Sequence, residues 1–66
     1  MASIETTNGT LYYNVVKIGD GYKGEVSHDL HKRFKGKVLR RYSKPYKTER
    51  GARNWLLKQI DIQKGK

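Results

Sequence analysis

The chain has 66 residues and a formal net charge of +9, from 15 lysines and arginines against six carboxylates. A chain of this length forms one domain and buries only about 60% of the surface that its unfolded form exposes. It therefore has little material for the walls of an enzyme cleft, and we expect no catalytic activity. The absence of cysteine excludes disulfides and thiolate metal sites.

The positive charge is concentrated in one third of the chain. Between Lys32 and Arg53, ten lysines and arginines stand against the single carboxylate of Glu49, so this segment alone has the net charge of the whole chain. Residues 1–31 have two lysines and four carboxylates. A field this uneven predicts attraction to phosphate-rich or acidic partners. The alternative is a cationic surface that only keeps the protein soluble.

The first half of the chain predicts a tail followed by a β-hairpin. Residues 1–9 are small and polar, which indicates a flexible tail. Thr10–Ile18 is rich in β-branched and aromatic residues, as is typical of a strand, and Tyr22–His28 reads as a second strand. Asp20-Gly21 between them is a strong hairpin-turn pattern, because both central positions of the favoured turn need a positive φ.

The register of this hairpin stays open at the level of sequence. A two-residue turn at Asp20-Gly21 places Val15 opposite Val26. A three-residue turn places Val16 opposite Gly24 instead. The one-residue difference exchanges the two faces of the sheet, so the core residues of the hairpin are not assigned.

The second half predicts a loop, a third strand and a helix. His28–Lys37 has one pair of apolar residues at helical spacing but is broken by a glycine, and we expect an exposed loop. Val38–Ser43 reads as a strand, and the helix is expected over Glu49–Ile62 with Thr48 as its N-cap. Residues 63–66 are expected to fray. An apolar stripe marks the buried side of the helix: Ala52, Trp55, Leu56 and Ile60.

These elements define the expected fold. It is a small α+β domain over residues 10–62, in which a three-stranded antiparallel β-sheet packs against one C-terminal α-helix, in the order βββα. Trp55 is expected to anchor the core and not to bind a ligand.

Two motifs that suggest chemistry have simpler explanations. Gly19–Val26 matches the glycine-rich pattern G-x-G-x-x-G-x-V, but no helix follows it and the chain has no room for a kinase catalytic segment. His28, Asp29 and His31 are too few for a fixed metal cage and lie in a segment without clear helical pattern. We expect no metal and no cofactor.

The basic segment points to nucleic acid, because it is interleaved with Phe34, Tyr42 and Tyr46. Lysine and arginine neutralise backbone phosphates, arginine reads guanine edges, and a short sheet enters the major groove. We expect a duplex-DNA-binding protein that uses a basic sheet face and the adjoining loop. Single-stranded DNA or RNA, stacked on the aromatic rings, is a variant of this hypothesis. The expected nucleic-acid-binding residues are Lys23, Lys32, Arg33, Lys35, Lys37, Arg40, Arg41, Tyr42, Lys44, Lys47 and Arg50.

A second hypothesis comes from a different class of protein. A small cationic inhibitor or adaptor of the phage type would dock on an acidic protein surface and offer an exposed strand edge for backbone pairing. In either case no secretory signal and no membrane-length apolar run is present, so we expect a cytoplasmic protein, associated with the nucleoid if it binds DNA.

The C-terminal half resembles a known family. Gly36–Leu56 is similar to the arm-type (AP2-like) DNA-binding domain at the N-terminus of phage tyrosine integrases. The resemblance implies three antiparallel strands and a helix, a sheet that enters the major groove, and Arg40 or Arg41, Tyr42 and Lys44 near bases or phosphates. The matching residues are Ser43, Lys44, Tyr46, Lys47, Thr48, Ala52, Trp55 and Leu56.

Two features depart from the family pattern. Pro45 stands where the family commonly has glycine, and the loop from Asp29 to Gly36 is longer and more basic than expected. We expect no recombinase catalytic domain, so the chain is either a free-standing relative of the family or a domain excised from a larger protein. The resemblance therefore supports DNA binding and does not imply recombination.

Overall fold

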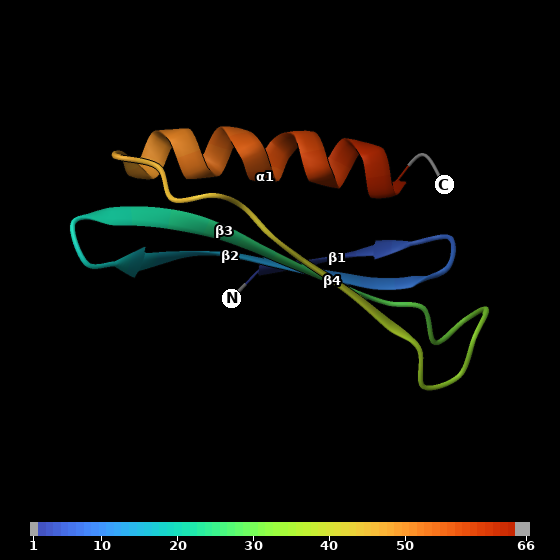
Figure 1. Ribbon diagram of the computed structural model, residues 1–66. Coiled ribbons are helices and arrows are strands. Elements are labelled where there is room, and N and C mark those ends of the chain that lie inside the picture. Colours follow the sequence, from blue (N-terminus) through green and yellow to red (C-terminus); the bar gives the residue numbers. More distant parts are fainter. Residues whose placement is uncertain (1, 65–66) are drawn as a thin grey trace.

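The computed structural model describes residues 2–64, which form one antiparallel sheet and one helix (Figure 1). The strands lie in chain order across the sheet, so every connection joins neighbours. The expected α+β class with a C-terminal helix is confirmed, but the sheet has four strands and not three. The elements are β1 (Ala2–Thr6), β2 (Gly9–Ile18), β3 (Gly21–Asp29), β4 (Val38–Tyr42) and α1 (Glu49–Lys64).

The additional strand, β1, occupies a segment that was expected to be a flexible tail. It pairs with the first half of β2, where Ile4 lies opposite the fully buried Leu11. Ile4 packs against the core while the neighbouring Ser3 and Glu5 are exposed. With one apolar side chain, an edge strand shows too weak a hydrophobic pattern to be recognised from its own sequence. It forms because β2 supplies the partner for its backbone hydrogen bonds. Met1 lies outside the described residues.

The hairpin of β2 and β3 turns at Gly19-Asp20, one residue earlier than the predicted Asp20-Gly21. Gly19 has a φ of 51° and Asp20 a negative φ, so only the first turn position requires glycine. Val15 lies opposite Gly24 and not opposite Val26, and the register from a three-residue turn is wrong as well. Compared with the register expected for a turn at Asp20-Gly21, the observed register is shifted by two residues. A shift by an even number keeps every side chain on the same face of the sheet.

The helix begins where the sequence indicates. The hydroxyl of Thr48 accepts a hydrogen bond of 3.1 Å from the amide of Gly51, as an N-cap does. The helix ends at Lys64, two residues beyond the predicted Ile62, because Gln63 is buried and bonded instead of frayed. Residues 65–66 of the predicted frayed end lie outside the described residues.

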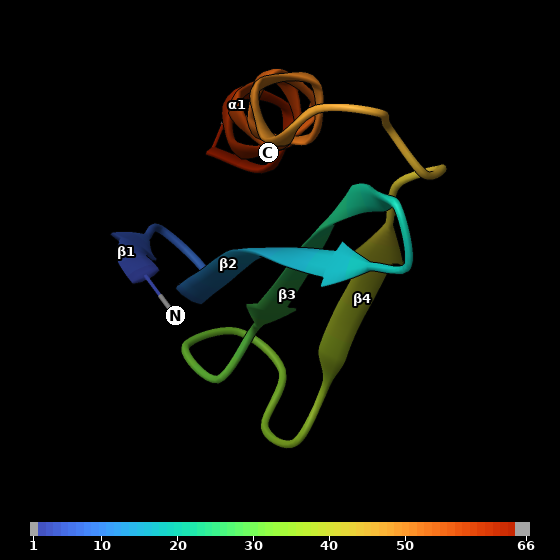
Figure 2. The ribbon, with the colours of Figure 1, turned by 90° about the vertical axis from the view of Figure 1, so that its left-hand side faces the viewer.

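The helix lies along one face of the sheet, over β2 and β3 (Figures 1 and 2). Its Leu56 forms the core with Leu11 and Val26, and Trp55 packs against this core partly buried, as the sequence predicts. Gly24 makes the close approach possible. A Cβ atom added there would lie 2.6 Å from the indole ring of Trp55, closer than such atoms come in proteins.

A buried polar network ties three elements together below the C-terminal end of the helix. His28 is only 2% exposed, and its Nε2 lies 2.7 Å from the hydroxyl of Thr6 in β1. Its Nδ1 lies 3.2 Å from Oε1 of Gln63 in α1. Both ring nitrogens of this buried histidine therefore have partners, which offsets the cost of removing them from water.

Because a Cβ atom at position 24 would lie too close to the indole ring of Trp55, we expect Gly24→Ala to destabilise the fold by about 1–3 kcal/mol through overpacking. The measurement is the free energy of unfolding from urea titration followed by circular dichroism. Ser27→Ala, in the same strand on the opposite face, is the control and is expected to change stability far less. Equal effects of the two substitutions would contradict the packing described above.

Gln63→Leu removes the partner of His28 Nδ1 and leaves a buried polar atom without a hydrogen bond. We expect a decrease of about 1–3 kcal/mol in the free energy of unfolding. Gln59→Leu makes the same substitution one turn earlier on the same helix and serves as the matched control. A decrease no larger than that of the control would show that the His28 network does not support the fold.

Candidate nucleic-acid interface

The predicted cations other than Lys23, which is half-buried in β3, lie along one side of the molecule. They occupy the 31–37 loop, β4, the 43–48 connection and the start of α1, which follow one another along the uncovered edge of the sheet (Figure 2). All of them are exposed. We call this set the basic edge: Lys32, Arg33, Lys35, Lys37, Arg40, Arg41, Lys44, Lys47 and Arg50.

Few of these charges are neutralised within the protein. Lys32 Nζ lies 3.1 Å from Oε2 of Glu5, which is in β1. Outside the basic edge, Arg53 pairs with Glu49 at 2.8 Å within the helix. Among residues 2–64 no other member of the basic edge has a carboxylate oxygen within 4.0 Å. The edge therefore keeps most of its charge available for an external partner.

The 31–37 loop is held by backbone hydrogen bonds at its base and inside it. The amide of Leu30 donates to the carbonyl of Lys37 at 2.9 Å, which closes the loop. The amide of Phe34 donates to the carbonyl of Leu30 at 2.7 Å, which forms the single helical turn that the four-residue spacing of these two apolar residues allows. Gly36 has a φ of 80° and reverses the chain toward β4. The loop presents its cations from a defined backbone.

The 43–48 connection is also fixed to the sheet. The amides of Tyr22 and Tyr46 each donate to the other's carbonyl at 2.7 Å, so the pairing of β3 with the chain continues past β4. The amide of Ser43 donates to Gly24 at 2.9 Å, and the Ser43 hydroxyl accepts from the amide of Gly24 at 2.7 Å. Pro45 lies between these anchored residues, where it needs no donor.

Aromatic rings lie beneath several of these cations. Lys23 Nζ is 5.1 Å from the ring centroid of Tyr42, and Arg33 and Lys37 lie 5.3 and 5.5 Å from that of Phe34. Tyr42 and Phe34 are 59% and 47% exposed. Cation–π contacts at the surface hold the charged groups near rings that a base could stack on.

The strand register divides β4 between the two faces of the sheet. Arg41 lies opposite Val26 on the helix side, while Arg40 and Tyr42 lie on the face that the helix leaves open. Lys23, one strand further in, shares the open face with Tyr42. The predicted base-reading residues are thus split, and Arg41 is separated from Arg40 and Tyr42.

The open face is not uniformly basic. Glu25 lies opposite Tyr42, and Asp29 lies opposite Val38, so carboxylates stand directly beside the cationic strand. Glu5 lies on the same face in β1, opposite Thr10. The positive charge is therefore strongest along the edge and loops, and it falls toward the middle of the sheet.

The backbone of β4 is unpaired on its outer side. Ser43 is hydrogen-bonded to Gly24 in β3, and Lys37 to Leu30 just after β3, which fixes the residues of this segment that face inward. Alternation then turns the N–H and C=O groups of Arg40 and Tyr42 outward. In the sheet of residues 2–64, β4 is an edge strand. The basic edge thus offers backbone donors and acceptors as well as side-chain charge.

The other motifs in the sequence have structural roles. The glycine-rich segment forms the β2–β3 turn and the contact with Trp55. His31 is exposed and lies 3.0 Å from the Thr10 hydroxyl, away from the buried His28. Within residues 2–64 no three histidines, cysteines or carboxylates are grouped as metal ligands. No helix in this part of the chain has the length and apolar character needed to cross a bilayer.

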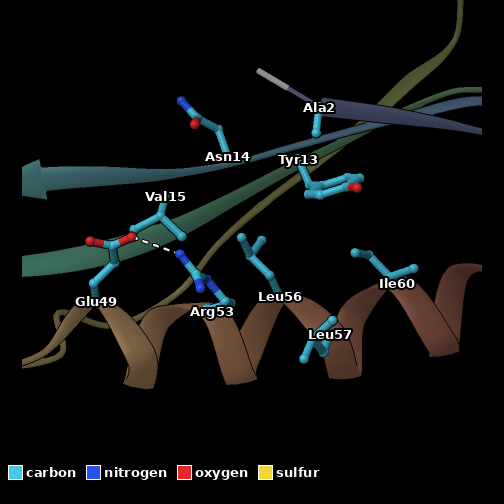
Figure 3. Close-up of a pocket in the computed structure, with 9 residues that line it drawn as sticks. All are labelled: Ala2, Tyr13, Asn14, Val15, Glu49, Arg53, Leu56, Leu57 and Ile60. Atoms are coloured by element: carbon cyan, nitrogen blue, oxygen red, sulfur yellow. Dashed lines mark hydrogen bonds and ion pairs between the residues drawn. The ribbon is translucent and has the colours of Figure 1, made fainter.

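A groove of about 540 Å³ lies between α1 and the β1–β2 side of the sheet (Figure 3). Tyr13, Leu56 and Ile60 extend into it from the two layers, and the Glu49–Arg53 ion pair closes one end. It is on the far side of the helix from β4. The groove shows that one helix is too narrow to cover four strands.

Comparison of the chain with protein-family models, curated proteins and solved structures found no match. The resemblance to the integrase arm-type domain therefore stays a prediction.

The contacts of Glu5 predict a pH effect. Hydrogen bonds from the Thr10 hydroxyl and then from Lys32 lower the pKa of Glu5 below its ordinary value of 4.5. Because the pKa is lowered in the folded state, the stabilising contribution is present above 4.5 and disappears as pH falls through the folded-state value. In an NMR titration we expect Thr10→Val to raise the pKa of Glu5 and Thr7→Val to leave it unchanged. No rise in Thr10→Val would contradict this assignment.

Proposed function

We propose that the protein is a non-enzymatic nucleic-acid-binding protein that holds duplex DNA along the basic edge. The observation that carries the proposal is the gathering of exposed, largely unpaired cations on one continuous side of an otherwise near-neutral scaffold. Neutralising phosphates releases counterions, and this supplies most of the affinity of proteins that bind DNA without sequence preference.

The geometry divides the proposed contacts into two kinds. One kind is contact with phosphates, which suits the exposed cations around β4. These are the cations of the 31–37 loop and of the 43–48 connection, together with Arg41 and Arg50. Arg40 and Tyr42, on the open face, suit base edges in the major groove, which admits a two-stranded ribbon such as β3–β4. Lys23 beside Tyr42 reaches the same groove wall.

The carboxylates of the open face favour an edge-first approach. Glu25 and Asp29 would meet phosphates if the whole sheet lay flat against the duplex, at the cost of like-charge repulsion. With β4 leading, the paired duplex lies away from β1 and from the middle of the sheet. A protein with this ligand would act in the cytoplasm on the nucleoid, in keeping with the phage-type resemblance of its C-terminal half.

A second candidate function rests on the open backbone of β4. An extended acidic segment of a partner protein would add to β4 as a further strand, with its carboxylates beside Arg40 and the loop cations. This candidate needs the strand edge, whereas DNA binding needs the spread of charge along the loops.

The experiment is fluorescence anisotropy of a labelled random-sequence DNA duplex across a salt series. We expect micromolar or tighter binding at low salt, with the logarithm of the association constant falling linearly with the logarithm of salt concentration. The combined substitution Lys35→Gln, Arg41→Gln and Lys47→Gln is expected to weaken binding and to reduce the slope by about 0.9 for each phosphate that is no longer neutralised.

The control removes the same number of positive charges away from the basic edge, by Lys17→Gln, Lys58→Gln and Lys64→Gln. It is expected to change affinity and slope much less. Absence of duplex binding at low salt would overturn the proposal, as would equal weakening in the two variants. Binding of a glutamate-rich extended peptide in its place would support the protein-partner candidate.

A further inference from the structure

The open face of the sheet has a hollow directly beside the basic edge. Its volume is about 310 Å³, at the lower end of the range for small-molecule sites. The register explains its shape: Tyr12, Ser27 and Arg40 form one row across β2, β3 and β4, and the short Ser27 lies between two long side chains. Asp29 and Val38, in the next row, complete the lining.

The hollow holds two opposite charges that do not neutralise each other. Within residues 2–64, neither the Arg40 guanidinium nor the Asp29 carboxylate has an ion-pair partner, and the two are not within 4.0 Å of each other. Each therefore keeps its hydrogen-bonding capacity for a ligand. A ligand that satisfies both must present hydrogen-bond donors to Asp29 and acceptors to Arg40.

Guanine is the nucleobase with this pattern. Its N1–H and N2–H₂ groups are adjacent donors that a carboxylate accepts in parallel, and its O6 and N7 are the acceptors that arginine bridges. Adenine, cytosine and thymine lack two neighbouring ring-edge donors of this kind. In a G·C pair the N1 and N2 donors are used by cytosine, so a guanine that engages Asp29 must be unpaired.

The wall of the hollow suits a flat ring. Tyr12 is 38% exposed, and its ring borders the hollow from β2. β2 and β4 lie two strand spacings apart, about 9.6 Å, and the short Ser27 between them leaves room for the edge of a base that stacks on Tyr12. Stacking on an exposed aromatic side chain is a general way in which proteins hold unpaired bases.

We propose that this hollow is a binding site for an unpaired guanine of a nucleic acid whose adjoining duplex lies on the basic edge. The site rests on the proposed function, since Val38 and Arg40 belong both to the hollow and to β4. Tyr12 stacks on the base, Asp29 accepts from N1 and N2, and Arg40 donates to O6 and N7. The protein thereby selects duplexes with an unpaired guanine.

The experiment compares five labelled DNA duplexes by fluorescence anisotropy at one salt concentration. Four differ only in a single bulged nucleotide, which is guanine, adenine, cytosine or thymine, and the fifth is fully paired. We expect the guanine bulge to bind at least about tenfold more tightly than the other bulges, because a single bidentate base contact already gives a difference of this size and the site makes two. Equal binding of the four bulges would overturn the proposal.

Single substitutions identify the side chains responsible for the guanine preference. Asp29→Asn is expected to reduce the preference for guanine, because only the contact of Arg40 with O6 and N7 then remains, without weakening binding of the paired duplex, since it removes a negative charge near phosphates. Glu25→Gln makes the same change on the same face outside the hollow and is expected to keep the preference. Tyr12→Leu is expected to weaken all four bulged duplexes relative to the paired one. Circular dichroism checks that each variant is folded.

The outcomes separate the two proposals. Salt-dependent binding of the paired duplex without a guanine preference would overturn the guanine site and leave the proposed function standing. A guanine preference in Asp29→Asn as large as that of the unchanged protein would overturn the site as described. Failure of all five duplexes to bind at low salt would overturn both.

Discussion

The contact of Gly24 with Trp55 determines where the helix lies, and most of the surface follows from it. The missing side chain lets the indole ring rest directly on the backbone of β3, and Leu56 then reaches Leu11 and Val26 in the core. A helix is about 10 Å wide and covers roughly two strands at their spacing. With the helix placed over β2 and β3, β4 and the whole opposite face stay exposed. The basic edge is thus a consequence of the packing of the other half of the chain.

The sequence was sufficient for the elements whose signals are local. The helix start at Thr48, its apolar stripe and the existence of the hairpin depend on residues close together in the chain, and the structure has them. The strand β1 was missed because its single core side chain, Ile4, gives no pattern without β2. The hairpin register was missed because Gly19-Asp20-Gly21 allows several turns, and the strand residues on either side of it do not distinguish between them.

The same distinction applies to the candidate sites. The basic edge was predictable because its cations are near neighbours in sequence, and the structure only had to leave them uncovered. The hollow was not predictable. Tyr12, Asp29 and Arg40 come from three strands, and only the observed register places them around Ser27 on one face. No spacing along the chain indicates that Tyr12 and Arg40 lie in the same row.

The open edge of β4 gives its positive charge a second consequence, for the behaviour of the protein in concentrated solution. An exposed strand edge is a template on which another copy of the chain can add, and edge lysines and arginines oppose such growth by repulsion between copies. High salt, bound polyanions or lysine acetylation would weaken that repulsion at the strand that most needs it. Under the proposed function, the charge that attracts a ligand would also oppose the addition of a second copy at β4, so solubility and ligand binding would be tuned by the same residues.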